Sequence, residues 1–179
     1  MSTDLHLVLS ALGPDRPGLV ADVTHYVTER GGNIEDSRMA VLGGEFGVMM
    51  LVSGSRDEIG RVARDRAELH ATTGLDVIVR DTKSPEEHRR AQSFPCVVTC
   101  DAIDNPGIVR AVSRALRDLG LNIVSLETTT YEAPVTGSPL FRLEAACDVP
   151  KGVTLAKVRI AMHEVADREN IDIEVAAPK

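Results

Sequence analysis

One motif occurs twice in this sequence at a fixed distance, and no other feature constrains the fold as strongly. The stretch Asp15–Val20 recurs as Asp104–Val109, and the pair Asn33–Ile34 recurs as Asn122–Ile123, both at an offset of 89 residues. The chain of 179 residues therefore contains two copies of one unit. Each copy has about 80–90 residues, which is a usual size for a domain.

The hydrophobic pattern of the first copy changes between the period of a strand and that of a helix. Leu5, Leu7 and Leu9 alternate with their neighbours as in a strand, whereas Val23 and Val27 recur at helical spacing. The elements predicted in this copy are a strand over 5–12, a helix over 17–30, strands over 34–42 and 46–52, a helix over 57–71 and a strand over 75–79.

The second copy repeats this order after a polar linker. Its predicted elements are a strand over 94–102, a helix over 107–119, strands over 122–131 and 141–147, a helix over 154–168 and a strand over 171–175. Residues 83–93 have no apolar pattern, so the predicted domains are 1–82 and 94–179. The order βαββαβ is typical of the ferredoxin-like α+β fold, in which both helices cover one face of a four-stranded antiparallel sheet.

The opposite face of the first sheet is predicted to be partly apolar. Val8 and Leu12 point away from Leu7 and Leu9, and Met49 and Leu51 likewise point away from the core side of their strand. Exposed apolar surface is unfavourable in water. We therefore expect this face to pack against the other copy or a second chain, with a homodimer as the expected assembly, and sheet-edge pairing between the copies is an alternative.

Charge and hydropathy exclude several classes of partner. The chain has 20 Lys+Arg against 27 Asp+Glu, a formal net charge of −7, and no basic cluster. Direct binding of nucleic acid is not expected, because it requires positive charge to neutralise phosphates. No apolar run reaches the roughly 18 residues of a membrane span, and the chain begins with polar residues rather than a signal peptide. We expect a cytoplasmic protein without a membrane partner.

The repeated motif places ligand-binding groups at the start of a helix. A helix N-terminus carries unpaired N–H groups and partial positive charge, which suit a carboxylate, and Gly18 lets a ligand approach the backbone. Asp15 would accept from an ammonium group, and Asn33 both donates and accepts. The candidate ligand-binding residues are Asp15, Arg16, Pro17, Gly18, Leu19, Val20, Asn33 and Ile34 in the first copy and Asp104, Asn105, Gly107, Ile108, Asn122 and Ile123 in the second.

These residue types suit a small zwitterion, but they do not all meet within one unit. The strand that begins at Asn33 starts across the sheet from the helix start, so we expect one copy's turn to combine with another copy's Asn strand. Purely structural roles are the alternative: Asp15 as a helix cap, Gly18 for close helix–sheet packing, and Asn33 in a turn. The second copy has Asn105 where the first has Arg16, so the two sites need not bind equally.

The motifs resemble those of the ACT domain, a small-molecule regulatory module of amino-acid metabolism. The resemblance rests on the stretches 11–20 and 33–46, and more loosely on Asp104–Gly107 and Asn122–Ile123. The longer stretches are similar to the glycine cleavage system transcriptional repressor family, a tandem of two ACT domains. This resemblance implies a sensor of a small amino acid, such as glycine or serine, that acts through a regulatory partner protein.

Other chemistry has little support in the sequence. Cys96, Cys100 and Cys147 are an odd number in apolar strands, so buried thiols are expected rather than disulfides or a metal site. No phosphate-binding loop or nucleophile elbow occurs. We therefore expect no catalytic residue, metal or cofactor, and no enzymatic activity. The alternatives are a small enzyme or a protein-interaction scaffold on the same fold, without amino-acid binding.

Overall fold

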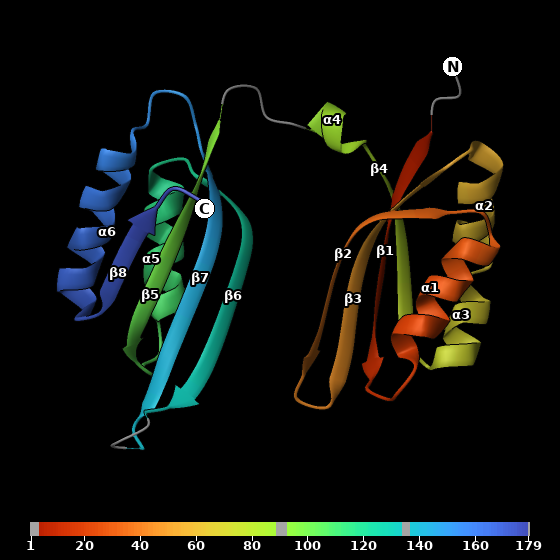
Figure 1. Cartoon of the computed structure of the whole chain (residues 1–179), viewed down its shortest axis with the longest axis horizontal. Coiled ribbons are helices and arrows are strands. Elements are labelled where there is room, and N and C mark those ends of the chain that lie inside the picture. The colour runs from red at the N-terminus through yellow and green to blue at the C-terminus, as the bar shows by residue number, and fades with distance from the viewer. Residues whose placement is uncertain (1–3, 89–92, 134–136, 179) are drawn as a thin grey trace. The chain divides into compact units, whose positions relative to one another are not determined.

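The chain forms two units of the same topology in a computed structural model, which describes residues 4–88, 93–133 and 137–178 (Figure 1). Unit 1 is Met1–Arg89 and unit 2 is Arg90–Lys179. Each unit is a four-stranded antiparallel sheet with helices on one face (Figure 1). Both are ferredoxin-like α+β folds, as the repeat predicts.

Unit 1 has its strands in the order β2-β3-β1-β4. The elements are β1 (Leu5–Pro14), α1 (Leu19–Glu29), β2 (Asn33–Leu42), β3 (Glu45–Gly54), α2 (Arg56–Arg64), α3 (Arg66–Thr73) and β4 (Asp76–Thr82). Leu7, Leu9 and Met50 are fully buried between the sheet and the helices. The core is mainly aliphatic, because the chain has only three Phe and two Tyr and no Trp.

Two helix boundaries in unit 1 differ from the sequence prediction. Helix α1 begins at Leu19 rather than Pro17, because Gly18 has φ 93° and serves as the N-cap. The single helix predicted over 57–71 is instead α2 and α3, which meet at Asp65. Asp65 has ψ 9° and accepts a hydrogen bond from Arg30 at 3.1 Å, so a contact from the residue that ends α1 holds the break.

Unit 2 has the equivalent strand order, β6-β7-β5-β8. Its elements are β5 (Phe94–Ile103), α5 (Ile108–Asp118), β6 (Asn122–Glu132), β7 (Pro139–Val149), α6 (Leu155–Glu169) and β8 (Asp172–Ala176). Within the predicted linker, α4 (Pro85–His88) is a single helical turn that Ser84 begins by accepting from the Glu87 N–H. In the described part of the chain, no helix is long and apolar enough to cross a membrane.

The sheet faces opposite the helices differ between the units. In unit 1 the apolar side chains of Leu12, Met49 and Ile78 are 57%, 53% and 58% exposed on this face. In unit 2 the counterparts of Met49 and Ile78 are Glu144 and Glu174. The expectation of an apolar face is therefore confirmed for unit 1 and does not extend to unit 2.

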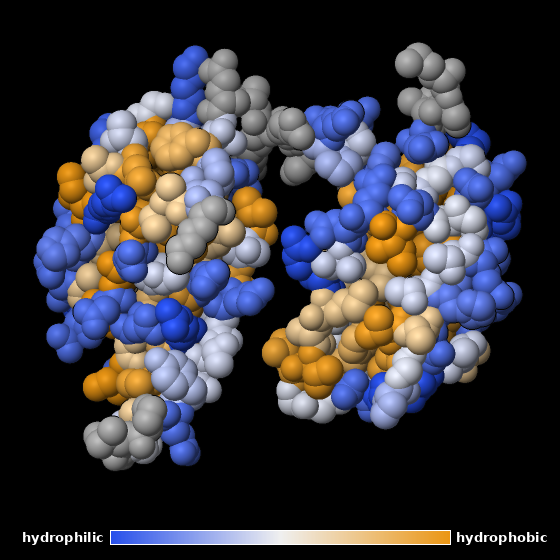
Figure 2. All heavy atoms as spheres, viewed as in Figure 1, coloured by the Kyte–Doolittle hydropathy of each residue, from blue (hydrophilic) through white to orange (hydrophobic). Residues whose placement is uncertain are grey.

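Apolar surface also gathers at one end of unit 1. Figure 2 shows it over the hairpin that joins β2 and β3, where Val41 and Leu42 are 51% and 77% exposed. These two residues lie beside the predicted glycine turn at Gly43, which has φ 65°.

Candidate functional site

The repeated turn leaves the start of α1 without a side-chain cap. Gly18 is the N-cap, and its carbonyl accepts the first helical bond from the Asp22 N–H at 2.9 Å. The N–H groups of the first helical turn before Asp22 have no helical partner. A residue with a side-chain oxygen at the N-cap would satisfy one of them, and glycine cannot. The helix start therefore presents N–H donors and partial positive charge outward.

Unit 2 reproduces this geometry. Gly107 is the N-cap of α5 with φ 104°, and it accepts from the Ala111 N–H at 2.9 Å. The turn is also fixed to the neighbouring hairpin in the same way, because the Asp15 N–H donates to Gly44 O and the Asp104 N–H donates to Pro139 O. The two copies thus share a local backbone structure as well as a motif.

The contacts of the turn argue against two of the purely structural roles. Asp15 does not cap α1, and its carboxylate has no hydrogen bond or ion pair within the described residues. A Cβ on Gly18 would meet only the Arg16 guanidinium at 3.7 Å, and one on Gly107 would meet nothing within 4 Å. Neither glycine is therefore needed for close packing, and the positive φ is what favours glycine.

Arg16 is the main difference between the two turns. Its Nη2 lies 2.7 Å from Asp22 Oδ2 and donates to Thr72 O at 3.3 Å, which ties the turn to the end of α3. In unit 2 the counterparts of Arg16 and Asp22 are Asn105 and Ala111, which form no such ion pair. The α5 start has no acidic residue in its first turn, so it is the more favourable of the two for an anion.

The predicted asparagines lie far from the turns within each unit. Asn33 pairs with Ser53 near one end of β3, whereas Pro14 pairs with Glu45 at the other end. Eight residues of strand separate the two rows, a distance of roughly 27 Å. The register in unit 2 is the same, with Asn122 opposite Asp148. Within one unit the turn and the asparagine therefore lie far apart, and this agrees with the separation that the element order predicts.

The remaining candidate residues divide between core and surface. Leu19 and Ile108 are buried in the cores, and Ile34 and Ile123 pack against them. The outward residues of the turns are all exposed, and they are Asp15, Arg16, Pro17, Gly18, Val20, Asp104, Asn105 and Gly107. Only this second group is exposed at the helix start, where Leu19 and Ile108 can contribute their backbone N–H groups but not their side chains.

Sequence reasoning missed a polar pair beside Asn33. His6 Nε2 lies 3.3 Å from Glu35 Oε1, although β3 separates their strands in the sheet. A register shift between Ile34 and Asp36 leaves Glu35 unpaired in the ladder and so free to reach His6. A bulge of this kind has no clear sequence signal, because both flanking stretches keep strand-like composition.

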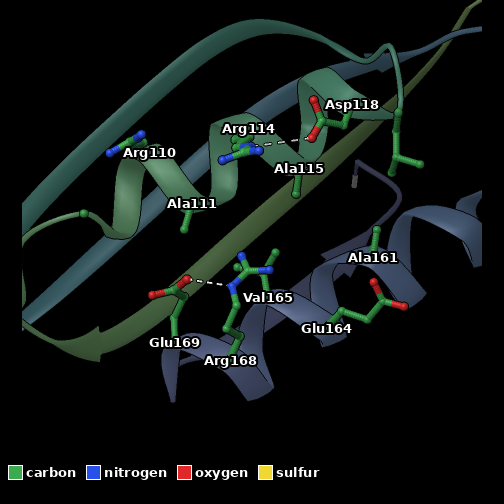
Figure 3. Close-up of a pocket in the computed structure, with 12 residues that line it drawn as sticks. Arg110, Ala111, Arg114, Ala115, Asp118, Ala161, Glu164, Val165, Arg168 and Glu169 are labelled. Carbon is green, nitrogen blue, oxygen red and sulfur yellow. Dashed lines mark hydrogen bonds and ion pairs between the residues drawn. The ribbon is translucent and has the colours of Figure 1, made fainter.

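A groove between α5 and α6 was also missed. It has a volume of about 730 Å³, and Gly107 is among the residues that line it. Ala111, Ala115 and Ala161 lie along its floor (Figure 3). In unit 1 the counterpart of Ala115 is Tyr26, whose hydroxyl donates to Val62 O at 2.6 Å. In unit 2 the groove is lined instead by Ala115 and by Leu119, which takes the place of Arg30. Some charged side chains on its rim form ion pairs with each other, such as Arg168 with Glu169 at 2.9 Å (Figure 3).

The three cysteines are buried in the core of unit 2, with Cys96 and Cys147 opposite each other on β5 and β7. Burial raises the pKa of Cys100 to about 11 and that of Cys147 to about 12. The neutral thiols thus serve as small apolar side chains. No group of His, Cys, Asp and Glu in the described ranges has the arrangement of a metal site.

The fold and the turn define the class of protein. Residues 5–80 match the family model described as ACT domain, and unit 2 has the same topology and the same glycine N-cap. Unit 1 therefore matches the ACT domain family over nearly its whole length, and unit 2 repeats its topology in tandem.

Its relatives include proteins of similar length and layout. The chain is 29% identical over 171 residues to the glycine cleavage system transcriptional repressor of Escherichia coli (strain K12), and the match covers 95% of this chain and 88% of that protein. A crystal structure of an unknown protein from Galdieria sulphuraria is 29% identical, with a TM-score of 0.83 over 99% of this chain and 100% of the other. Another, described as a glycine cleavage system transcriptional repressor, is 25% identical with a TM-score of 0.71 over 97% of both chains.

Proposed function

We propose that the chain is a regulatory sensor that binds a small amino acid at the helix starts of its ACT units and acts through a partner protein. The observation that carries this proposal is the duplicated turn, in which Gly18 and Gly107 leave a helix start uncapped beside an aspartate. The helix start would hold the carboxylate of the amino acid. Asp15 or Asp104 would accept from its ammonium group.

Glycine and serine are the proposed ligands. Their small side chains suit an open, shallow turn, and the related Escherichia coli protein is named for the glycine cleavage system. Asn33 and Asn122 would contribute only to the turn of another ACT unit, because about 27 Å separates each from the turn of its own unit. The net charge of −7 supports action through a protein rather than directly on DNA.

A thermal-shift screen of the full chain against the standard amino acids tests this proposal. A ligand at about a hundredfold its dissociation constant should add roughly 2.7 kcal/mol of stability. We expect a selective rise in Tm with glycine or serine, and a smaller rise in an Asp15→Asn, Asp104→Asn variant. A flat response to every amino acid would contradict the proposal and favour the scaffold without amino-acid binding.

A further inference from the structure

On the outer sheet face of unit 1, charged and apolar side chains are arranged so that they complement the same face of a second copy. We define the outer face as the side of the sheet opposite the helices. The register sets its side chains in rows across β2, β3, β1 and β4: Asp36, Leu51, Val8 and Arg80 in the first row, Arg38, Met49, Ser10 and Ile78 in the next, and Ala40, Gly47, Leu12 and Asp76 in the third. The middle of the face is apolar, and charged residues lie on the two edge strands.

From this pattern we infer that the outer face of unit 1 pairs with the same face of a second copy of the chain. The two-fold axis lies along the strands, so that β2 of one chain faces β4 of the other. In this arrangement Asp36 lies opposite Arg80 of the second copy, and the symmetry repeats this pair. Leu51 lies opposite Val8, and Leu12 lies opposite Gly47, so that the Leu12 side chains of the two copies, each beside Gly47 of its own chain, come together.

The charges select this axis over its alternative. Arg80 has no hydrogen bond or ion pair in the part of the chain that the structure describes, so its charge is available to a partner. Asp36 accepts from Arg38 and from the Ser37 N–H through Oδ1, and its Oδ2, which has no partner among the described residues, is the oxygen that would meet Arg80. A two-fold axis across the strands would instead set Arg38 opposite Arg38 of the second copy, and like charges in contact are unfavourable. Both axes keep the strands of the two sheets aligned, as in the usual packing of sheets face to face, so the charges decide between them.

The outer face of unit 2 does not have this pattern. The counterparts of Arg38, Met49 and Ile78 are Glu127, Glu144 and Glu174, so this row would repel its own copy. The contrast shows that the fold does not itself require an apolar outer face.

The size of the face is sufficient for a stable dimer. With strands about 4.8 Å apart, three of about 34 Å and β4 of about 24 Å give a four-stranded face of roughly 600 Å². This approaches the roughly 800 Å² that each partner buries in a standard interface. The proposed ligand site lies at the helix starts rather than on this face, so the pairing is independent of the proposed function.

A charge exchange between two variants tests the pairing directly. Asp36→Arg alone would set two arginines against each other at each charged pair, and Arg80→Asp alone would set two aspartates against each other. We expect sedimentation equilibrium of the full chain to show a dimer for the natural sequence. The dissociation constant of each variant should be roughly 100-fold higher. An equimolar mixture of the two variants should recover the dimer. In a mixed dimer one charged pair joins the unchanged Asp36 of one chain to the unchanged Arg80 of the other. The second pair joins the arginine introduced at position 36 to the aspartate introduced at position 80, so both pairs again join opposite charges.

Matched variants in unit 2 provide the control. Ser125 occupies the position equivalent to Asp36, and Ala146 the position equivalent to Leu51. Leu51→Glu should dissociate the dimer, whereas Ser125→Arg and Ala146→Glu should leave it intact. A monomeric natural chain, dimeric single variants or a mixture that stays monomeric would each overturn the inference. Circular dichroism of each variant would confirm that a loss of dimer is not a loss of fold.

Discussion

At the scale of single residues, two glycines determine how the helix starts are built. Gly18 and Gly107 have φ of 93° and 104°, and both leave their helices without a side-chain cap. The sequence predicts glycine at these positions for ligand access or packing. The positive φ is the reason for glycine here, and in both units the same turn is hydrogen-bonded to the neighbouring hairpin, at Gly44 O and Pro139 O. That tie joins residues distant in sequence and has no local signal.

Replacing these glycines should destabilise the units even though space is available for a Cβ. We expect Gly18→Ala and Gly107→Ala each to lower the free energy of unfolding by about 1–2 kcal/mol, because L-residues are strained at positive φ. Urea denaturation measures this. Gly60→Ala, inside α2 and with only Arg64 near its Cβ, is the matched control and should add about 1 kcal/mol. Equal effects at all three positions would contradict the assigned backbone angles.

At the scale of elements, the helices of unit 1 are joined by contacts that unit 2 lacks. Arg30 at the end of α1 forms ion pairs with Asp65 at 3.1 Å and Glu68 at 2.6 Å, and it lies 3.9 Å from the centroid of the Tyr26 ring. The repeat predicts two equivalent helix pairs. It cannot predict that Arg30 would be Leu119 in unit 2 and would leave a groove, because the change alters contacts between helices rather than the helices themselves.

Removing Arg30 should loosen the connection between α1 and α3. We expect Arg30→Leu, which introduces the residue of unit 2, to reduce the free energy of unfolding by about 1–2 kcal/mol, since charged hydrogen bonds and a cation–π contact are lost. Chemical denaturation measures the change. Arg64→Leu, at an exposed arginine of α2 that has no ion pair or side-chain hydrogen bond within the described residues, should have an effect within about 0.5 kcal/mol. Similar losses in both variants would show that the Arg30 contacts do not stabilise the fold.

The buried thiols of unit 2 should make its stability depend on alkaline pH. The folded state raises the pKa of Cys100 to about 11 and of Cys147 to about 12, whereas unfolded thiols titrate near 9. Above about pH 9 the unfolded chain releases protons that the folded chain retains, so stability falls as pH rises towards the folded values.

The expected slope is up to about 1.4 kcal/mol per pH unit for each thiol. Denaturation at pH 8, 9, 10 and 11 measures this slope. In Cys147→Ala the fall in the free energy of unfolding per pH unit should be smaller by the contribution of one thiol. Unit 1 contains no cysteine, and burial raises the pKa of its Tyr26 from an ordinary value of 10.0, so unit 1 provides the internal comparison between pH 8 and pH 10. An unchanged slope in the variant would mean that this thiol is not buried in solution.

At the scale of the whole molecule, the duplication fixes the fold while the two copies have diverged in their surfaces. The spacing of 89 residues predicts both βαββαβ units, and the strand orders confirm them. The same spacing does not reveal that α2 and α3 are separate, because Ile59, Val62 and Leu69 continue one apolar stripe across the break at Asp65. The sequence does, by contrast, indicate the acidic outer face of unit 2. Glu127, Glu144 and Glu174 each lie in a different strand, and each follows directly after an apolar residue that points to the core side.

This divergence also bears on the two helix starts. Arg16 and Asp22 occupy the turn of unit 1 with an ion pair, and unit 2 has no counterpart. We expect the two proposed sites to differ in affinity for an amino acid. Calorimetric titration of the single variants Asp15→Asn and Asp104→Asn would show unequal losses, whereas equal losses would contradict a role for the Arg16–Asp22 pair.

The central claim is that the repeated helix starts bind a small amino acid. Isothermal titration calorimetry of the full chain with glycine and with serine tests it most directly, with the Asp15→Asn, Asp104→Asn variant measured in parallel. We predict saturable binding to the natural chain and at least a tenfold weaker association, or about 1.4 kcal/mol, in the variant at unchanged stability. No binding of either amino acid, or equal binding by the variant, would contradict the claim.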